Sequence, residues 1–332
     1  MSASEAPPRV SVLMPVFNTA RYLKDALHSI RAQSLTAFEL IAVDDGSTDD
    51  SRAVLREFAA QDSRVRLVLR ENRGLIATRN ELLRAARAEL VAWMDSDDIS
   101  LPERLRLQVA AFEADPELIC LGTAAQCIDP EGRFLNVERY PCSHEQILHW
   151  QQHGGAIRFP TTMMRRARAL QVGGFREPFR MGEDFDLLLR LSEIGKMANL
   201  ADTLYLYRQH LRSVCATIGP QWPVYRDHAL ALARERRERG SDRLQDGGTL
   251  VIPMTDAAYA KRNEWLIYRA WAGHALGNED FGLARRYAWA ALRRRPASPQ
   301  TWKLALRVVL RRARAAGRRG AASAAARQNT PE

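Results

Sequence analysis

Four short apolar runs, each followed by a polar cluster and a helical period, constrain the fold of this chain more than any other feature. The runs cover residues 10–16, 40–43, 65–69 and 90–94, and the helical periods cover about 22–33, 51–60, 75–86 and 101–114. Continuous apolar strands that alternate with helices are typical of a parallel sheet with helices on both faces. The sequence therefore predicts an α/β fold with a mostly parallel sheet in its first hundred residues.

The polar clusters fall at the same point of each repeat, directly after the apolar run. They read PVFN, DDGSTDD, ENRG and DSDD in chain order. In open α/β sheets ligands bind at the carboxyl ends of the strands, where these clusters are expected to meet. Four consecutive clusters therefore predict one binding pocket at that edge of the sheet.

The fourth cluster is the most acidic, because Asp95, Asp97 and Asp98 lie within four positions. Like charges this close repel one another and raise one another's pKa values, and a bound cation relieves this. Mg²⁺ and Mn²⁺ suit such a site, since they take one or two carboxylates from a protein and their other ligands from phosphate oxygens and water. Ser100 and Glu103 also predict a capping box at the start of the next helix. In the alternative interpretation, Asp97, Asp98 and Ser100 only compete to cap that helix.

The order of elements changes after Pro116. Runs at 118–123 and 134–137 indicate a smaller mixed part of the sheet, followed by a helix over 183–195 and a strand over 203–210. Beyond about residue 221 the pattern is helical, with a hairpin over 265–298 and a basic amphipathic helix over 301–319. The hairpin has the spacing of one tetratricopeptide repeat and is as readily a plain helical extension. The predicted divisions are a flexible start (1–9), two halves of the α/β domain (10–116 and 117–220), a helical extension (221–319) and a disordered tail (320–332).

The net charge of +10 is concentrated at the end of the chain. Of the 49 Lys and Arg residues, 13 lie from Arg285 onward, whereas only one of the 39 acidic residues does. The body is therefore near neutral, which argues against nucleic acid as a partner. The basic helix favours an anionic membrane surface over the two alternatives, a solvated helix and a nucleic-acid contact. No signal peptide or membrane-spanning run is present in the sequence, so we expect a cytoplasmic protein at the inner face of the cell membrane.

The four cysteines show no paired spacing that would indicate a zinc site or a disulfide framework. We expect them to be small buried side chains; they are Cys120, Cys127, Cys142 and Cys215.

Seven motifs together point to a known family. VSVLMPVFN, AVDDGSTDDS, ENRGLIATRN, WMDSDD, VGGF, GEDFDLLLRL and YRQHLRSV follow in the order and approximate spacing of the family 2 (GT-A fold) glycosyltransferases, which the chain resembles from about residue 10 to 214. The resemblance implies a Rossmann-like, mostly parallel mixed sheet flanked by helices, with an α-helical C-terminal extension. It also implies a metal-dependent, inverting transfer of a sugar from a nucleotide diphosphate sugar to an acceptor hydroxyl, in cell-surface polysaccharide biosynthesis.

The resemblance assigns the metal site to the acidic cluster. Asp97 would bind Mn²⁺ or Mg²⁺, and Asp95 would hold the ribose hydroxyls or reach the metal through water. Asp98 would orient these two acids or cap the following helix. His210, in the YRQH motif, would be a third protein contact, either as a metal ligand or as a donor to phosphate.

Residues 10–116 would bind the nucleotide sugar. Asp45, or in second place Asp44, would accept the ring N–H of a uracil- or thymine-like base, so a UDP- or dTDP-sugar is expected. The other residues expected to line the nucleotide sugar are Pro15, Val16, Asn18, Arg73 and Ser96. Arg79 and Asn80 lie within a predicted helix and are as readily structural.

Residues 117–220 would bind the acceptor, a sugar or a lipid-linked saccharide. Asp184 is expected to be the base that takes the acceptor proton and Glu183 a supporting residue, although the two roles could be exchanged. Gly173, Gly174 and Phe175 match an acceptor-side turn, where missing side chains let a sugar approach the backbone.

The segment 154–166 also resembles an acceptor-side segment of the family. Just before it, Glu145, His149 and His153 share one helix face, but their spacing does not fit the H-E-x-x-H zinc motif. A solvated or acceptor-side helix is therefore expected there.

Two rival functions remain from the sequence. A nucleotidyltransferase on a related sheet would need a glycine-rich basic loop after the first strand, and PVFNTARYL lacks one. A non-catalytic scaffold that recruits partners through its helical tail would tolerate Asp97→Asn or Asp184→Asn.

Overall fold

The computed structural model describes residues 7–218, 221–252 and 258–328, which form two compact units. The first unit contains residues 7–127, 137–208 and 221–252, and the second contains residues 128–136, 209–218 and 258–328. Helix α9 (Trp222–Arg239) thus belongs to the first unit, although the sequence suggested a helical extension beginning at 221. The functional roles given to the two halves at 10–116 and 117–220 stay predictions.

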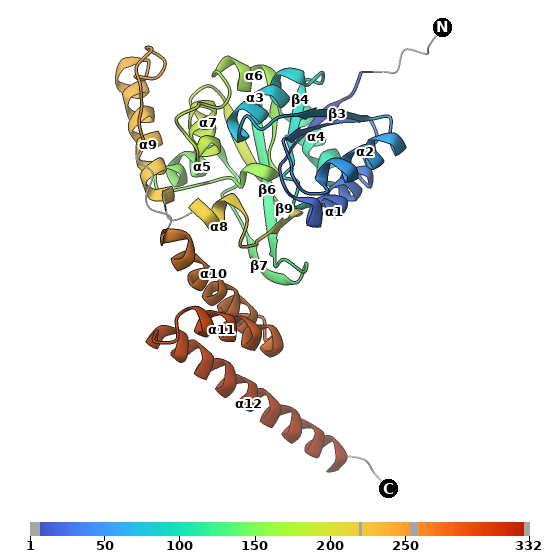
Figure 1. Cartoon of the computed structure of the whole chain (residues 1–332), viewed down its shortest axis with the longest axis vertical. Helices are drawn as coiled ribbons and strands as arrows, with labels where there is room; N and C mark the ends of the chain where they lie inside the picture. The colour runs from blue at the N-terminus through green and yellow to red at the C-terminus, as the bar shows by residue number, and fades with distance from the viewer. Residues whose placement is uncertain (1–6, 219–220, 253–257, 329–332) are drawn as a thin grey trace. The chain divides into compact units, whose positions relative to one another are not determined.

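A single large sheet organises the first unit (Figure 1). It has nine strands, in the order β3-β2-β1-β4-β8-β6-β9-β5, with β7 paired to β6. The parallel part joins β2 to β1 and β3, and β1 to β4, whereas β8 pairs antiparallel with β4 and β6. The mostly parallel mixed sheet predicted from the sequence is confirmed. The strands are β1 (Val10–Val16), β2 (Phe38–Asp45), β3 (Val65–Arg70), β4 (Leu90–Trp93), β5 (Ile99–Ser100), β6 (Leu118–Ile128), β7 (Phe134–Glu138), β8 (Met163–Arg165) and β9 (Lys196–Arg208).

Helices cover both faces of this sheet, because alternate residues of each strand belong to two different cores. Val12 and Met14 of β1 pack with Leu27 of α1, while Leu13 between them lies in the core that includes Leu82 of α3. The helical elements of this unit besides α9 are α1 (Ala20–Arg31), α2 (Ser51–Gln61), α3 (Leu75–Ala85), α4 (Arg104–Ala114), α5 (His144–Gln151), η1 (Phe159–Thr161), α6 (Arg166–Gln171) and α7 (Glu183–Ser192).

The capping box predicted at Ser100 is wrong. Ser100 lies in β5 and pairs with Tyr205 of β9, and helix α4 begins only at Arg104. The Ser100 backbone N–H donates to the Ser29 hydroxyl at 3.1 Å, and the Ser100 hydroxyl accepts from the Gln33 amide at 3.2 Å. Contacts with Ser29 of α1 and with Gln33 therefore occupy the Ser100 hydroxyl and backbone N–H, the two groups that a capping box with Glu103 would use.

The second unit contains α8 (Val214–Ile218), α10 (Ala258–Gly277), α11 (Phe281–Arg294) and α12 (Pro299–Gln328). The predicted helical hairpin is confirmed: α10 and α11 pack through Trp271 and Tyr287, whose ring centroids lie 5.1 Å apart. The Tyr287 hydroxyl donates to the buried Asp129 carboxylate at 2.5 Å. The likeness to a tetratricopeptide repeat stays a prediction.

Within the described parts of the chain, no helix is long and apolar enough to cross a membrane.

Two further expectations differ from the structure. Residues 320–328 continue α12, in contrast to the expected disorder, and their alanine-rich sequence has high helix propensity. Residues 1–6 and 329–332 lie outside the described residues. Cys120 and Cys127 are buried as expected, whereas Cys142 and Cys215 are exposed.

Candidate functional site

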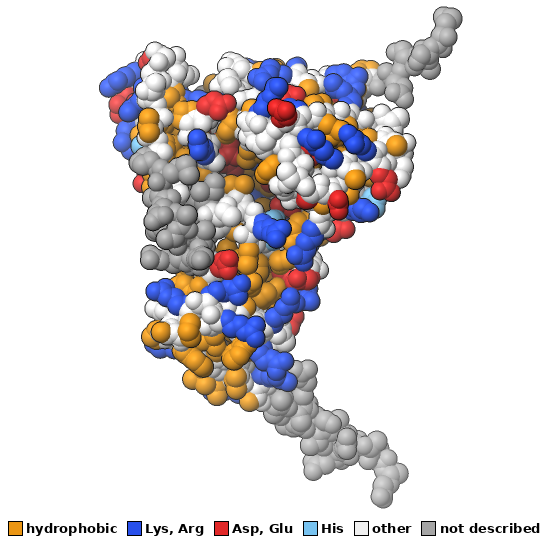
Figure 2. All heavy atoms as spheres, in the orientation of Figure 1, with side chains coloured by type: hydrophobic (Ala, Val, Ile, Leu, Met, Phe, Trp, Pro, Cys, Tyr) orange, Lys and Arg blue, Asp and Glu red, His pale blue; other side chains and the backbone are white. Residues whose placement is uncertain are grey.

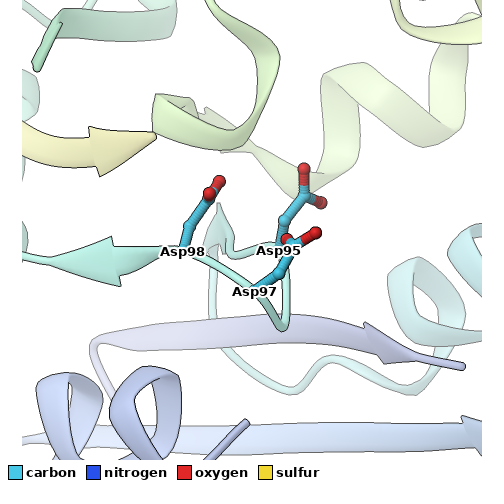
Figure 3. Close-up of side chains that lie close together, drawn as sticks. All are labelled: Asp95, Asp97 and Asp98. Atoms are coloured by element: carbon cyan, nitrogen blue, oxygen red, sulfur yellow. The ribbon is translucent and has the colours of Figure 1, made fainter. Parts of the chain in front are cut away.

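The acidic cluster lies on the loop after β4, at the carboxyl end of the parallel strands. Asp95, Asp97 and Asp98 each offer a carboxylate oxygen, and these three oxygens lie within 4.8 Å of one another. Figure 3 shows all three side chains pointing to the same side of that loop. The structure therefore gathers the acids that the sequence placed at one edge of the sheet.

Strand β9 fixes the conformation of this loop. The Arg208 N–H donates to the Asp98 carboxylate at 2.7 Å, and the Arg208 guanidinium donates to the Asp97 carbonyl oxygen at 2.8 Å. The Asp95 N–H donates to the Tyr205 hydroxyl oxygen at 3.2 Å. Because these bonds hold the backbone, the three carboxylates are positioned before any ligand binds.

The donor set fits a hard divalent cation. Burial raises the pKa of Asp95 to about 6, and the charges of Asp97 and Asp184 add to this effect against the opposing charge of Arg79. Burial, together with Asp97 and Asp95, raises the pKa of Asp98 well above its usual range. Mg²⁺ and Mn²⁺ prefer hard oxygen ligands, and three close carboxylates supply them. A bound cation would also offset the negative charge that the raised pKa values of Asp95 and Asp98 disfavour.

The acids at the start of α7 form a second group. Glu183 is 6 % exposed and Asp184 is partly exposed, so only the second carboxylate is open to a ligand. Burial raises the pKa of Glu183 to about 7, with Arg79 opposing the rise and Asp184 adding to it. The turn before the helix needs Gly182 (φ +72°), because a Cβ there would lie 3.0 Å from the Trp222 ring of α9.

Arg79 of α3 connects the two acidic groups, a role that the sequence did not reveal. Its guanidinium pairs with Glu183 and lies 3.8 Å from Asp95. The aromatic rings of Phe159 and Phe175 lie 4.7 and 5.4 Å from its Cζ, and the side chain is only 6 % exposed. The sequence does place Arg79 on the apolar side of a predicted helix. Because buried charges are normally paired, this position could have indicated that Arg79 contacts an acidic group.

The predicted base-binding acids are occupied by bonds within the protein. Asp45 accepts the backbone N–H groups of Arg73 and Gly74 at 2.8 and 2.9 Å and pairs with Arg70. Asp44 is fully buried and accepts the Arg52 guanidinium at 2.7 Å. Both carboxylates thereby order the loops at the carboxyl end of β2. Their contact with a base stays a prediction.

The remaining donor-side residues lie on or near the same edge. Pro15 and Val16 end β1, and the Asn18 amide oxygen accepts the Thr48 N–H at 2.8 Å. Ser96 is buried and its hydroxyl accepts from the Thr19 hydroxyl at 2.9 Å. Arg73 is exposed. Their roles toward a nucleotide sugar stay predictions.

His210 and the acceptor-side turn have different surroundings. His210 belongs to the second unit, and its Nδ1 accepts the Arg212 N–H at 3.3 Å. Gly173 and Gly174 adopt φ values of +85° and +64° at the end of α6, which favours glycine. Phe175 is 3 % exposed and packs edge-on against Trp93, so its ring contributes to the core. The predicted ligand roles of these residues are not tested by these contacts.

Two further arginines, Arg104 and Arg208, contact the backbone next to and within the loop that carries the acidic cluster, and the sequence analysis did not single them out. Arg104 is fully buried, donates to the Trp93 carbonyl oxygen at 2.9 Å, and stacks on the Tyr205 ring at 5.0 Å. Burial lowers its pKa to about 10, with the charges of Asp98 and Asp95 opposing this. Arg208 is also buried, with 4 % of its surface exposed. The contacts of Arg104 with Thr162 and Tyr205 join residues that are far apart in the sequence, and so do those of Arg208 with Asp97 and Asp98. No local pattern in the sequence indicates these contacts.

Comparison with known proteins identifies the first unit. The model of glycosyl transferase family 2 matches residues 11–174. The putative glycosyltransferase EpsE of Bacillus subtilis is 34 % identical over 61 % of this chain and 73 % of its own length. The amylovoran biosynthesis glycosyltransferase AmsE of Erwinia amylovora is 31 % identical over 60 % of this chain and 75 % of its own length.

Longer relatives and a solved structure share the same region. Chondroitin synthase of Escherichia coli is 31 % identical over 60 % of this chain, which spans only 28 % of that protein. The structure of S. aureus TarS 1-349 in complex with UDP superposes with a TM-score of 0.55 at 19 % identity, covering 84 % of this chain and 73 % of TarS. This likeness shows the GT-A fold. With the matches to EpsE and AmsE, it follows that the chain belongs to glycosyl transferase family 2.

Proposed function

We propose that the protein transfers a sugar from a nucleotide diphosphate sugar to an acceptor hydroxyl, with inversion, in the synthesis of a cell-surface polysaccharide. The observation that carries this proposal is the arrangement of two acidic groups, Asp95 to Asp98 after β4 and Glu183 with Asp184 on α7, joined through Arg79. One group suits a cation and a diphosphate, and the other suits an incoming hydroxyl. The names of EpsE and AmsE support the glycosyl transfer.

On the donor side, Asp97 and Asp95 would hold Mn²⁺ or Mg²⁺. A bound cation would neutralise charge on the leaving diphosphate. Asp45 would orient the base and Asp95 the ribose. A uridine nucleotide is supported by TarS, whose structures contain UDP and UDP-GlcNAc. A hexosyl group is the donor sugar that we expect.

On the acceptor side, Asp184 would accept the proton of the attacking hydroxyl. It is the more exposed acid of the pair, whereas Glu183 is held by Arg79. In an inverting transfer the acceptor oxygen attacks the anomeric carbon from the side opposite the leaving diphosphate, so base and cation site must face each other across the sugar. Glu183 would keep Arg79 in place between them.

The decisive experiment screens UDP- and dTDP-sugars for hydrolysis and transfer, with and without Mn²⁺. We expect at least one donor to be turned over only with metal. Asp97→Asn and Asp184→Asn should each lower turnover at least 100-fold, and only Asp97→Asn should weaken Mn²⁺ binding by about 10-fold or more. Asp227→Asn, at a side chain of α9 that is 66 % exposed, is the matched control. Full activity in both variants would refute the proposal and favour a scaffold.

The comparisons contain no support for the nucleotidyltransferase alternative. The loop after β1 also differs from a triphosphate-binding loop, because Asn18 uses its amide oxygen to hold the Thr48 N–H of the neighbouring loop. A product analysis that finds nucleoside monophosphate transfer in place of nucleoside diphosphate release would reverse this conclusion.

We also propose that α12 attaches the enzyme to an anionic membrane at the cytoplasmic face. Thr301 and Val308 face the hairpin of the second unit, and Thr301 accepts the Trp265 indole N–H at 2.7 Å. Another face of the helix carries large apolar side chains that are 49–61 % exposed, namely Trp302, Leu306, Val309 and Leu310. Figure 2 shows hydrophobic side chains gathered over the first half of α12, bordered by Lys and Arg.

The composition of α12 selects the kind of surface. The helix contains eight basic residues and no acidic one over Pro299–Gln328. An exposed apolar stripe beside arginines suits the interface of anionic lipids, where each basic residue contributes about 1 kcal/mol.

Vesicle flotation tests this attachment. The wild-type chain should float with phosphatidylglycerol vesicles and not with phosphatidylcholine vesicles. The double change Trp302→Ser with Leu306→Ser should reduce flotation at least 10-fold, whereas Val251→Ser, at a side chain that is 83 % exposed in the first unit, should not. Unchanged flotation of the double variant would contradict the proposal, and a change of oligomeric state in its place would indicate contact between two copies.

A further inference from the structure

A hollow of about 620 Å³ lies beside α5 in the first unit. One wall is the segment before the helix, with Tyr140 and Pro141, and the other is the helix face that carries Glu145, His149 and Trp150. Its volume is within the usual range of small-molecule sites, about 300–1,000 Å³. None of these residues has a part in the proposed transfer step.

The lining combines aromatic rings with hydrogen-bonding groups. Trp150 exposes 48 % of its surface, whereas Ile147, one turn earlier on α5, is fully buried. The Tyr140 hydroxyl donates to the Glu138 carboxylate at 2.6 Å, so Tyr140 lines the hollow chiefly with its apolar ring. Glu145 and His149 add exposed polar ends.

This pairing of surfaces matches the chemistry of a saccharide. A pyranose has an apolar C–H face that packs on an aromatic ring, and hydroxyl groups around its edge that exchange hydrogen bonds with carboxylate, imidazole and guanidinium groups. A nucleotide or a phosphate would instead call for a mainly cationic lining, whereas the one arginine of this lining, Arg139, is offset by Glu145.

The hollow is tied to the reaction site by a chain of contacts. Glu138 accepts from Tyr140 and also from the Arg158 guanidinium at 3.0 Å. The Arg158 guanidinium lies 4.6 Å from the Tyr207 ring of β9. The residue after Arg158, Phe159, packs on Arg79, which lies 3.8 Å from Asp95. The wall of the hollow and the acidic cluster therefore belong to one connected region.

Asn199 of β9 holds the two segments of this region in register. Its amide donates to the Pro141 carbonyl oxygen at 2.7 Å and to the Ala156 carbonyl oxygen at 3.0 Å. The close approach requires Gly122 in β6, because a Cβ there would lie 2.2 Å from the Asn199 oxygen. Pro141 in the wall of the hollow and Ala156 in the 154–166 segment are thus both fixed to β9.

We propose that this hollow binds the sugar units of the acceptor saccharide that precede the reacting hydroxyl, with Trp150 and Tyr140 as platforms and Glu145 and His149 as hydroxyl partners. The inference rests on the proposed glycosyl transfer and names its acceptor as an oligosaccharide. It assigns Trp150 to acceptor binding and gives it no part in donor binding or bond breaking.

Calorimetric titration of the full chain, with UDP and Mn²⁺ present, tests the binding directly. The probes are a neutral tetrasaccharide (chitotetraose) and an acidic one (a hyaluronan tetrasaccharide). We expect at least one to bind, Trp150→Ala to raise its Kd at least 10-fold, and Trp150→Phe to stay within about 3-fold of wild type. Trp289→Ala, at a tryptophan 57 % exposed in the second unit, is the matched control and should leave Kd unchanged.

Steady-state kinetics separates this inference from the proposed function. Trp150→Ala should raise KM for the acceptor while leaving donor hydrolysis without acceptor unchanged. If the wild type turns over no nucleotide sugar, the proposed function fails irrespective of Trp150. If the wild type transfers sugar but Trp150→Ala leaves Kd and KM unchanged, or if neither tetrasaccharide binds, the assignment of the hollow is overturned while the transferase function stands.

Discussion

Replacing Arg79 with methionine tests the central electrostatic feature of the site. Met is close in length and apolar, so the change removes the cation with little loss of volume. Arg79 is 6 % exposed and serves both Glu183, itself 6 % exposed, and Asp95 at 3.8 Å. Removing one partner from a buried ion pair typically costs about 3–5 kcal/mol, because the other charge is left uncompensated. We expect a loss of that size at pH 8.

The loss should depend on pH in a defined direction. The pKa of Glu183 is about 7 and that of Asp95 about 6, both above their values in an unfolded chain, and Arg79 lowers both. Without Arg79 both pKa values rise further. A carboxyl whose pKa is raised by folding contributes stability below its unfolded pKa and loses it as pH rises through the folded pKa. The deficit of the variant should therefore shrink to about 1–2 kcal/mol at pH 5, where both acids are protonated.

Urea unfolding of wild type and variant at pH 5 and pH 8 measures this difference. Arg106→Met is the matched control, since Arg106 pairs with Glu103 on the surface and such a pair contributes about 0–1 kcal/mol. Adding Glu183→Gln to Arg79→Met should restore at least half of the stability at pH 8, because the uncompensated carboxylate is then gone. A deficit below about 1 kcal/mol at pH 8, or equal deficits at both pH values, would refute the reasoning.

Two further changes test the framework of the two units. Gly174→Ala should destabilise the protein by about 2 kcal/mol or more, because φ is +64° and the new Cβ would lie 2.5 Å from the Asn80 side-chain oxygen. Gly173→Ala should cost only about 1 kcal/mol, because φ is +85° but the new Cβ would meet no atom within 4 Å. Equal thermal shifts for the two variants would count against this account. Tyr287→Phe removes the donor to the buried Asp129 and should lower the stability of the second unit by about 1.5–3 kcal/mol. Amide exchange in α11 should rise accordingly, and unchanged protection there would show that Asp129 finds another partner.

Much of the site was predictable because its acids follow strands of a recognisable repeat. The carboxyl ends of β1, β2 and β4 are fixed by apolar runs that are visible in the sequence, and the side chains of Asp95, Asp97 and Asp98 must then share one edge. The acids at the start of α7 were marked by their motif. The internal bonds of Asp44 and Asp45 were not predictable, because the same carboxylates suit a ligand or a backbone N–H equally well.

The sequence by itself determined the alternation of strands and helices, the edge of the sheet that carries the site, and the helical hairpin near the end. Each depends on local periodicity and turn chemistry, which neighbouring residues encode. Only the tertiary structure decided that Arg79 reaches Glu183 across 104 residues and that Arg208 holds Asp98 across 110. It also decided that Ser100 joins a strand and that α9 packs in the first unit. Such pairings depend on which distant segments the folded sheet brings together, and no local pattern records that choice.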